Sequence, residues 1–285
     1  MSEAAVRPVP EPGGCLTTLH KIRAYVKKEW QVELSYTFAF LFSVFGIFTG
    51  IATYFFIDRL FGHRITADLA PYGTPYFAYA LVGNAFFAYV GSAIGGIPGR
   101  LTEEQTQGTL EALLATPTSL GLIVLAMAVW STLAASIEVG LYVLVGAVGF
   151  GADFSRINGA TVACVAGLVI VAFNSIGLLE AACLLVFKRR TAVVWAFNGL
   201  SALLGGVFFP VTVLPVWLQR LAEWNPITHA IRALQLGIYQ DASVGRVAGE
   251  LFALVGFCAL LAPLGCASVN WALHRAKVEG TLSQY

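Results

Sequence analysis

Six long runs of apolar residues, separated by short polar stretches, dominate the pattern along this chain. A helix needs about 20 mostly apolar residues to cross the hydrocarbon core of a membrane. The runs approach or exceed that length, although the fifth is short and the third and fourth are long enough to tilt or protrude. The sequence therefore predicts an all-α polytopic membrane protein whose six-span domain covers residues 34–272. The predicted spans are residues 34–57, 75–97, 120–149, 159–187, 191–209 and 247–272.

The composition supports this class and excludes others. Only 12% of the 285 residues are charged and 58% are hydrophobic, whereas soluble domains carry about 25% charged residues. A net charge of +1, without a basic patch interleaved with aromatic residues, gives no sign of a nucleic-acid partner. None of the five cysteines forms a CxxC pair and four lie in apolar runs. We therefore expect neither a disulfide framework nor a metal site.

The pattern of residues 1–33, before the first span, predicts a cytoplasmic tail followed by a surface helix. It contains three prolines and then the charged run HKIRAYVKKEWQVE, without the apolar core of a cleavable signal. Leu19, Ile22, Val26 and Trp30 recur at helical spacing, with lysines on the other faces. This pattern predicts a basic amphipathic helix on the inner membrane surface. A solvated cytosolic helix is the alternative.

The distribution of Lys and Arg predicts the orientation. With both termini inside, eleven basic residues fall in inner segments and six in outer segments, and all five lysines lie inside. Because inner loops of membrane proteins are rich in Lys and Arg, we expect a plasma (inner) membrane protein with cytoplasmic ends. Residues 273–285 would form a short cytoplasmic tail, and residues 100–118 would also face the cytoplasm.

That cytoplasmic loop contains the acidic stretch RLTEEQTQGTLEALLATPTS. Leu110, Leu113 and Leu114 are spaced so that they share one face of a helix. The stretch therefore predicts a short helix over about residues 100–117, lying along the membrane plane. It would either dock on a partner or lie at the interface without one.

The ends of this predicted helix are marked by the residues around it. Thr102 can cap its N-terminus, and Glu103 and Glu104 then lie in the first turn, where acids suit the helix dipole. Gly108 interrupts the run, and Pro117 prevents simple continuation into the third span. Kinks are therefore expected on both sides.

A second informative segment, about residues 210–240, follows the fifth span. Its prolines and tryptophans predict two short helices that dip into the outer leaflet and return, because Trp prefers the membrane boundary. Irregular backbone must not lie bare in lipid, so this hairpin would pack on protein. An ordinary surface loop is the alternative. The residues that carry this prediction are Pro210, Pro215, Trp217, Trp224, Asn225 and Pro226.

Two acidic residues fall within spans, where an ionisable group indicates either function or a structural hydrogen bond. Glu138 lies in the outer half of the third span and Glu180 nearer the inner edge of the fourth. Their different depths argue against a pair. Asn174 or Asn198 could instead be a hydrogen-bond partner of Glu180.

Two motifs resemble one known family. The stretch EEQTQGTLEALLATPTS is similar to the cytoplasmic coupling region of type-2 ABC exporter permeases, and NPITHAIRALQLGIY is similar to a segment that follows the fifth span there. Many relatives have Arg-Glu where this chain has Glu103-Glu104, a departure that bears on the docking contacts. The first motif matches at Glu103, Glu104, Gly108, Thr109, Leu110, Glu111, Leu113, Leu114, Thr116 and Pro117. The second matches at Asn225, Pro226, Thr228, Ile231 and Arg232.

The resemblance implies a permease that works with other chains. Two six-span subunits would pair, here as a homodimer, with the first and fifth spans at the seam. Gly205 and Gly206 would permit close helix approach there. Two copies of an ABC ATPase subunit would dock on the coupling residues, and the 210–240 hairpin would cap the external end of the pathway as a gate.

The chemistry of ATP hydrolysis would lie on that partner. A P-loop needs Gly directly before its Lys, and none of the five lysines here is preceded by Gly. We therefore expect no enzyme activity and no cofactor in this chain, with ATP and Mg²⁺ bound by the ATPase. An aromatic-rich, weakly charged set of spans suits an amphipathic or lipid-linked cargo such as a glycan, a lipid or a drug. An ion-coupled secondary transporter and a polytopic membrane enzyme are the rival classes.

Overall fold

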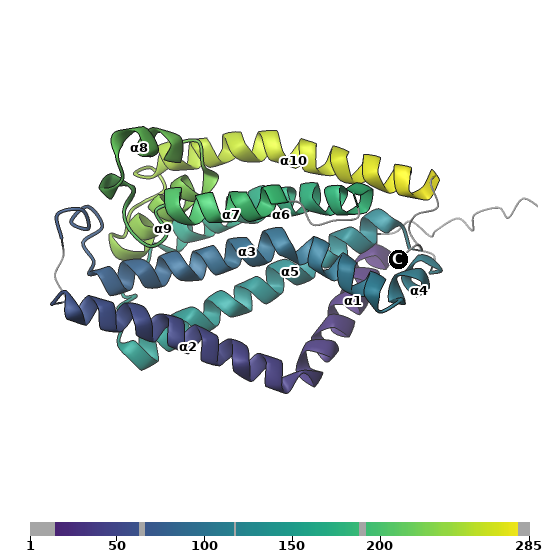
Figure 1. The fold of residues 1–285 in the computed structure, drawn as a ribbon, viewed down its shortest axis with the longest axis horizontal. Coiled ribbons are helices and arrows are strands. Elements are labelled where there is room, and N and C mark those ends of the chain that lie inside the picture. Colours follow the sequence, from purple (N-terminus) through teal and green to yellow (C-terminus); the bar gives the residue numbers. More distant parts are fainter. Residues whose placement is uncertain (1–14, 63–65, 117, 188–191, 279–285) are drawn as a thin grey trace, which may run out of the picture.

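The computed structural model describes residues 15–62, 66–116, 118–187 and 192–278. Within these ranges the chain is a bundle of long helices, with short helices at both ends and no strand (Figure 1). The predicted all-α fold class is confirmed. Among the described residues, five helices are long and apolar enough to cross a membrane. They are α2 (Thr37–Leu60), α3 (Tyr76–Thr106), α5 (Leu120–Leu144) with the π-helix η1 (Val145–Gly149), α6 (Gly159–Phe187) and α10 (Ala248–Val278).

The fifth predicted span, residues 191–209, is shorter than expected. The helix there, α7 (Ala192–Leu204), has 13 residues, which at 1.5 Å per residue span about 20 Å. The chain then turns irregularly before Pro210. Gly205 is buried, and a Cβ added to it would lie 2.6 Å from Ile227 Cγ2. This turn therefore packs within its own subunit, and the subunit seam at Gly205 and Gly206 stays a prediction.

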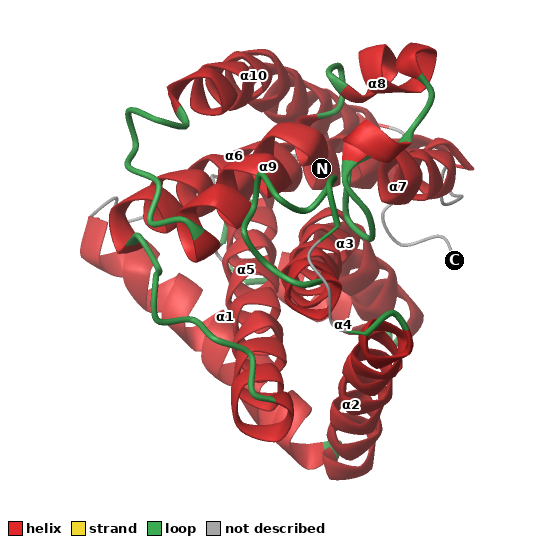
Figure 2. Cartoon of the chain, turned by 90° about the vertical axis from the view of Figure 1, so that its left-hand side faces the viewer, coloured by secondary structure: helices red, strands yellow, loops and turns green. Residues whose placement is uncertain are grey.

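Helix α3 runs through the middle of the bundle, with α5 and α6 on either side (Figures 1 and 2). Its contact with α6 is close because Gly177 lies over the α3 backbone. A Cβ added there would be 2.9 Å from the carbonyl oxygens of Ala93 and Ile94. Pro98 lacks the N–H that would otherwise bond to the Ile94 carbonyl. Gly177 therefore lets α3 and α6 pack with little space between them.

The amphipathic helix predicted before the first span is present as α1 (Cys15–Ser35). It ends at Ser35, and the chain turns sharply at Tyr36 into α2 (Figure 1). Helix α1 packs against α5 through Tyr25, which is buried, and Ile22 and Val26, which are partly buried. Leu19, predicted on the same apolar face, is 57% exposed. The buried face is thus rotated from the predicted one, because the helix covers a protein surface as well as facing lipid.

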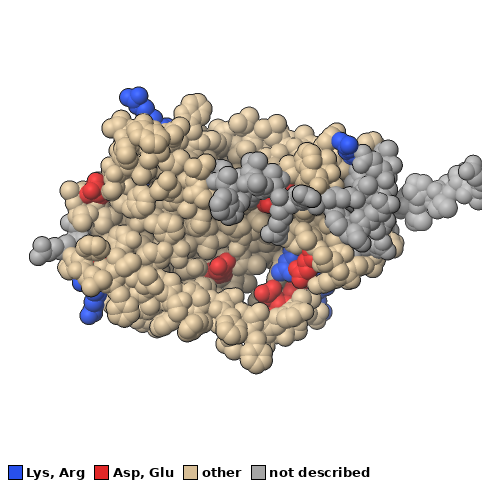
Figure 3. Space-filling view, viewed as in Figure 1, with Lys and Arg blue, Asp and Glu red and all other residues tan. Residues whose placement is uncertain are grey.

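Helix α2 lies at the edge of the bundle, on the side away from α10 (Figures 1 and 2). Only 11% of its most apolar window is buried. Its exposed aromatic residues include Phe38, Phe42 and Phe45. The side of the bundle shows few charged atoms between its ends (Figure 3), as expected for a surface in contact with lipid.

The connections segregate to two ends of the bundle. One end, here called the α4 end, holds α4 (Thr109–Leu114), the C-terminal turns of α3 and the last turns of α10 (Figure 1). The opposite end, the α9 end, holds η2 (Val211–Val213), α8 (Val216–Ala222) and α9 (Pro226–Tyr239). The described parts of all segments predicted to be cytoplasmic lie at the α4 end. Those predicted to be external lie at the α9 end.

Candidate functional site: an ion-pair network at the α4 end

The predicted coupling helix is divided into two parts. Residues 100–106 continue α3 beyond its span, so Thr102 lies inside a helix and donates to the Pro98 carbonyl instead of capping an N-terminus. The chain breaks at Gly108, whose φ of +70° favours glycine. Helix α4 then has only six residues. The predicted single helix is therefore wrong in its extent, because an acidic first turn and a helix continuation look alike in sequence.

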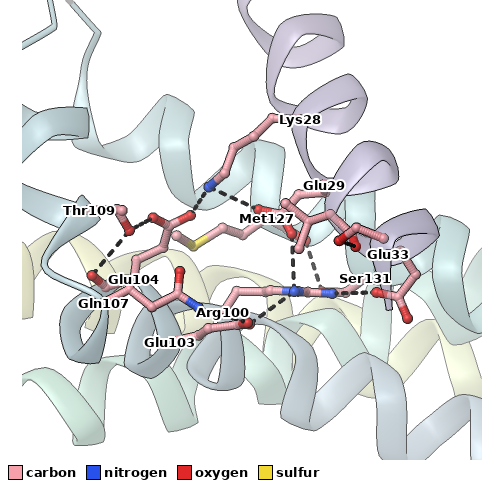
Figure 4. Close-up of polar contacts among 12 residues, drawn as sticks. Lys28, Glu29, Glu33, Arg100, Glu103, Glu104, Gln107, Thr109, Met127 and Ser131 are labelled. Atoms are coloured by element: carbon pink, nitrogen blue, oxygen red, sulfur yellow. Dashed lines mark hydrogen bonds and ion pairs between the residues drawn. The ribbon is translucent and has the colours of Figure 1, made fainter. Parts of the chain in front are cut away.

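Glu104, predicted to face a partner, is instead turned into the protein. It is 3% exposed and lies near the C-terminus of α3. Its carboxylate accepts hydrogen bonds from Lys28 Nζ on α1 and from Thr109 Oγ1 at the start of α4 (Figure 4). One side chain thus joins three helices.

Arg100 forms the second centre of the same network (Figure 4). Its Nη1 lies 3.1 Å from Glu29 Oε2 and 2.9 Å from Glu103 Oε2, and its Nη2 lies 3.4 Å from Glu33 Oε2. The guanidinium carbon is also 5.9 Å from the centre of the Trp130 ring on α5. Arg100 therefore ties α1 and α5 to α3.

Each buried carboxylate of this network lies beside a Lys or Arg side chain. Glu29 and Glu104 are each 3% exposed, and a buried carboxylate is strongly destabilising unless a cation compensates it. Lys28 Nζ lies 3.2 Å from Glu29 Oε1 and also contacts Glu104. Burial disfavours the ammonium, but the hydrogen bonds and charges of Glu104 and Glu29 together outweigh it and raise the pKa of Lys28. Lys28 therefore remains charged at neutral pH.

Four members of this network were not predicted as site residues: Lys28, Glu29, Glu33 and Arg100. The available signal was the spacing of Glu29 and Glu33, which places two acids on one helix face. Only the fold shows that this face of α1 meets the end of α3. The acidic stretch is acidic in part because it pairs with α1.

The remaining predicted coupling residues have mixed positions. Leu113, predicted on the docking face, packs inward against the cluster that α1 and α5 share. Gly108 and Thr109 are exposed at the turn before α4. The side chains of Leu110, Glu111 and Leu114, and all of Pro117, lie outside the described residues. The structure thus shows an inner contact of α4 through Leu113.

The predicted external hairpin consists of η2, α8 and α9. Asn225 caps α9: its Oδ1 accepts from the Ile227 N–H at 3.1 Å, and its Nδ2 donates to Ser201 Oγ at 3.2 Å. Pro226 occupies the first turn of α9, and Pro215 precedes α8. Helix α9 is largely buried against α6 and α10, whereas Trp217 and Trp224 are 64% and 82% exposed. The two helices therefore have different environments, α9 in the protein and α8 on its surface.

A second cluster of charges holds this hairpin to α10. Arg232 Nη1 lies 2.9 Å from Glu250 Oε1, and its Nη2 lies 3.0 Å from Glu223 Oε1. His229 Nδ1 also contacts Glu250, and its Nε2 lies 2.9 Å from the Glu223 carbonyl oxygen. Of these, only Arg232 was singled out from the sequence. The others come from three separate elements, so spacing could not group them.

The polar residues within spans make separate contacts. Ser92 on α3 donates to Glu138 at 3.1 Å. Asn174, predicted as a partner of Glu180, instead donates to Thr132 Oγ1 on α5 at 3.1 Å. Glu180 is buried beside the cluster at the α4 end. Glu138 and Glu180 thus belong to different helix contacts.

Comparison with known proteins places this architecture in a family. Five helices of span length, with a short helix tethered at one end, define a multi-pass membrane protein. The sequence model of the family described as "ABC-2 type transporter" matches residues 20–239. The chain belongs to this family and is a type-2 ABC permease, as its two motifs indicated. Such permeases are the membrane component of a transporter.

Two curated relatives carry names consistent with this family. "Probable multidrug ABC transporter permease YbhR" of Escherichia coli (strain K12) is 28% identical over 180 residues, or 62% of this chain and 47% of YbhR. "Nodulation protein J" of Rhizobium leguminosarum bv. trifolii is 29% identical over 238 residues, or 79% of this chain and 84% of that protein. The chain therefore spans about half the length of YbhR and most of Nodulation protein J.

Replacing Glu104 should loosen α4. Glu104→Gln removes a negative charge beside the Lys28 ammonium. The Lys28 side chain is 42% exposed and still pairs with Glu29. We expect a loss of about 1–2 kcal/mol, below the ~3–5 kcal/mol for a fully buried broken pair. Hydrogen exchange of residues 107–116 and thermal unfolding in detergent would measure the change.

The matched control is Glu103→Gln. Glu103 is 42% exposed at its side chain, so its loss should cost about 0–1 kcal/mol. Equal exchange rates in residues 107–116 for the two variants would contradict a special role for Glu104.

Stability at the α9 end should depend on pH through His229. The hydrogen bond with Glu250, together with that to the Glu223 carbonyl, raises the pKa of His229 despite burial. Because the pKa of His229 is raised in the folded protein, its protonated form stabilises the fold fully below the ordinary pKa near 6.5. This stabilisation is lost as the pH rises through the pKa of His229 in the folded protein. We expect the Tm to fall over that range, and His229→Gln to remove this part of the slope.

Tryptophan fluorescence during thermal unfolding would measure the effect, with His20→Gln as the control. His20 is exposed on α1 at the other end of the bundle. A slope that survives in His229→Gln would show that other groups cause it.

Proposed function

We propose that this chain is the membrane-spanning permease subunit of an ATP-driven exporter in the plasma (inner) membrane, with the α4 end and both termini in the cytoplasm. The observation that carries the proposal is the attachment of α4. A six-residue helix at the end of the bundle is bonded through Glu104 to α1 and α3. An element held in this way can pass a displacement to several spans at once.

Two copies of an ABC ATPase subunit would dock beneath the bundle, on the free side of α4. Gln107, Gly108 and Ala112 are exposed there, whereas Glu104 and Leu113 face inward. The ATPase would hold ATP and Mg²⁺. Movement of α4 would then reach α1 through Lys28 and, beyond Tyr36, the span α2.

A second permease subunit would complete the pathway. The exposed Phe-rich face of α2 is available for a homodimer seam, and α7 would lie beside it. The cargo would be amphipathic or lipid-linked, such as a glycan, a lipid or a drug. It would leave near α8 and α9, with the hairpin from Pro210 to Pro226 acting as the external gate.

Labelling in intact cells would establish the orientation. Gln107 is exposed at the α4 end and Ser243 at the α9 end. In a cysteine-free background, a thiol reagent that does not cross membranes should label Ser243→Cys and not Gln107→Cys. Labelling of Gln107→Cys from outside would reverse the proposed topology.

A charge on the free side of α4 should uncouple the transporter. Ala112 is exposed in the single subunit, so Ala112→Asp should leave folding unchanged. Burying an unpaired carboxylate against the ATPase costs several kcal/mol, so copurification with the ABC ATPase subunit should fall at least about tenfold. Transport in proteoliposomes should fall with it.

Ala24→Asp on α1 provides the control, because Ala24 is exposed at the same end of the bundle but not on α4. Normal copurification and transport by Ala112→Asp would place the ATPase contact elsewhere.

A further inference from the structure

An apolar cavity of about 310 Å³ lies in the half of the bundle nearer the α9 end. Its volume is at the lower end of the range for small-molecule sites, about 300–1,000 Å³. Four helices contribute to its wall, and none of the contacts at the α4 end involves it. Lining residues include Val82, Phe86, Val143, Ala166, Val169 and Ile238.

The cavity lies where α5 and α6, which both pack on α3, border it from two sides. Asn174 Nδ2 donates to Thr132 Oγ1 there at 3.1 Å. One turn nearer the α9 end, Ser136 and Ile170 line the bottom of the cavity. The Asn174–Thr132 contact therefore closes the cavity at its deep end.

The dimensions of the cavity fit one leaflet of a bilayer. Along α3 it extends from Leu81 to Tyr89, and eight residues of helix rise about 12 Å. Half of the hydrocarbon core of a bilayer is about 15 Å thick. Val143 and Ile157 on the rim are 38% and 43% exposed, so the cavity opens on the side of the bundle.

A polar hollow of about 600 Å³ lies directly beyond the apolar cavity, at the α9 end. Ile157 lines both spaces. Phe154 of the apolar cavity stacks on Tyr239 of the polar hollow, with ring centres 6.3 Å apart. The two spaces thus adjoin at Ile157, apolar below and polar above.

The polar hollow carries one charge of each sign. Arg156 and Asp241 both line it, with Ser155 and Gln240. Asn158 Nδ2 donates to Asp241 Oδ1 at 3.0 Å and fixes that carboxylate in place. A cation and an anion in one hollow complement a zwitterion better than a single charge.

We infer that these adjoining spaces bind one zwitterionic phospholipid of the surrounding bilayer. One acyl chain fills the apolar cavity, the phosphate lies at Arg156, and the ammonium group lies at Asp241. The inference rests on the proposed function only in its assignment of the lipid to a leaflet. That leaflet is the outer one if the α4 end is cytoplasmic. The bound lipid wedges α5 and α6 apart beneath the hairpin.

Photocross-linking tests this site in the purified full chain without the ATPase. The protein is placed in vesicles of phosphatidylethanolamine and phosphatidylglycerol that contain a trace of phosphatidylethanolamine with a diazirine on one acyl chain. Cross-linked peptides should concentrate in residues 136–143 and 162–170. Filling the cavity with Ala166→Trp should reduce this labelling more than about tenfold, since several buried methylenes lose their site.

Ala163→Trp is the matched control, because Ala163 is exposed on α6 and does not line the cavity. Arg156→Gln, at an exposed residue that cannot disturb the core, should reduce labelling about two- to fivefold, the range for an exposed ion pair. Arg220→Gln, exposed at the same end, should not.

Three results would overturn the inference. The first is even labelling along all lipid-facing helices that Ala166→Trp leaves unchanged. The second is equal labelling by Arg156→Gln and the unaltered protein. The third is equally strong labelling by a diazirine phosphatidylglycerol, which lacks the ammonium group. None of these measurements uses transport or ATP, so a failure of the exporter proposal would leave them readable.

Discussion

The buried carboxylate of Glu104 is the constraint on which the α4 end depends. A charge at 3% exposure is tolerated only with a cation beside it, and the nearest one, Lys28, belongs to a helix 76 residues earlier. The need for a cation beside Glu104 therefore determines where α1 lies. Once α1 is placed, Glu29 is buried too, and Arg100 satisfies it at 3.1 Å. Each charge in the network therefore determines the position of the next.

The sequence predicted the fold class and most of the spans, because a membrane imposes a length and a composition that are visible residue by residue. It also predicted a break at Gly108 and short helices after Pro215 and in the Asn225–Pro226 segment, since these depend on local backbone chemistry. These features need no knowledge of the tertiary structure.

The side-chain environments could not be predicted in the same way. Glu104 looked like a surface acid because nothing in its neighbourhood of the sequence shows that Lys28 approaches it. Leu113 looked like a docking residue because helical spacing identifies a shared face but not the side that is covered. His229 and Glu250 meet only when α9 folds back on α10. In each case the deciding partner is distant in sequence.

Helix α3 connects the two ends of the molecule, so it offers a path by which a displacement of α4 can reach the hairpin. At one end α3 carries Glu104, bonded to α4. At the other, the Tyr79 hydroxyl donates to the Gly206 carbonyl at 2.6 Å, and Gln235 on α9 donates to the Tyr79 carbonyl at 2.9 Å. A single helix of 31 residues thus holds both the ion-pair network at the α4 end and the base of the hairpin. Coupling between such sites requires an element with two arrangements that both ends bias. The contact of Gly177 with the α3 backbone restricts α3 from bending freely at that level, so a rigid tilt of α3 is the motion that this packing favours.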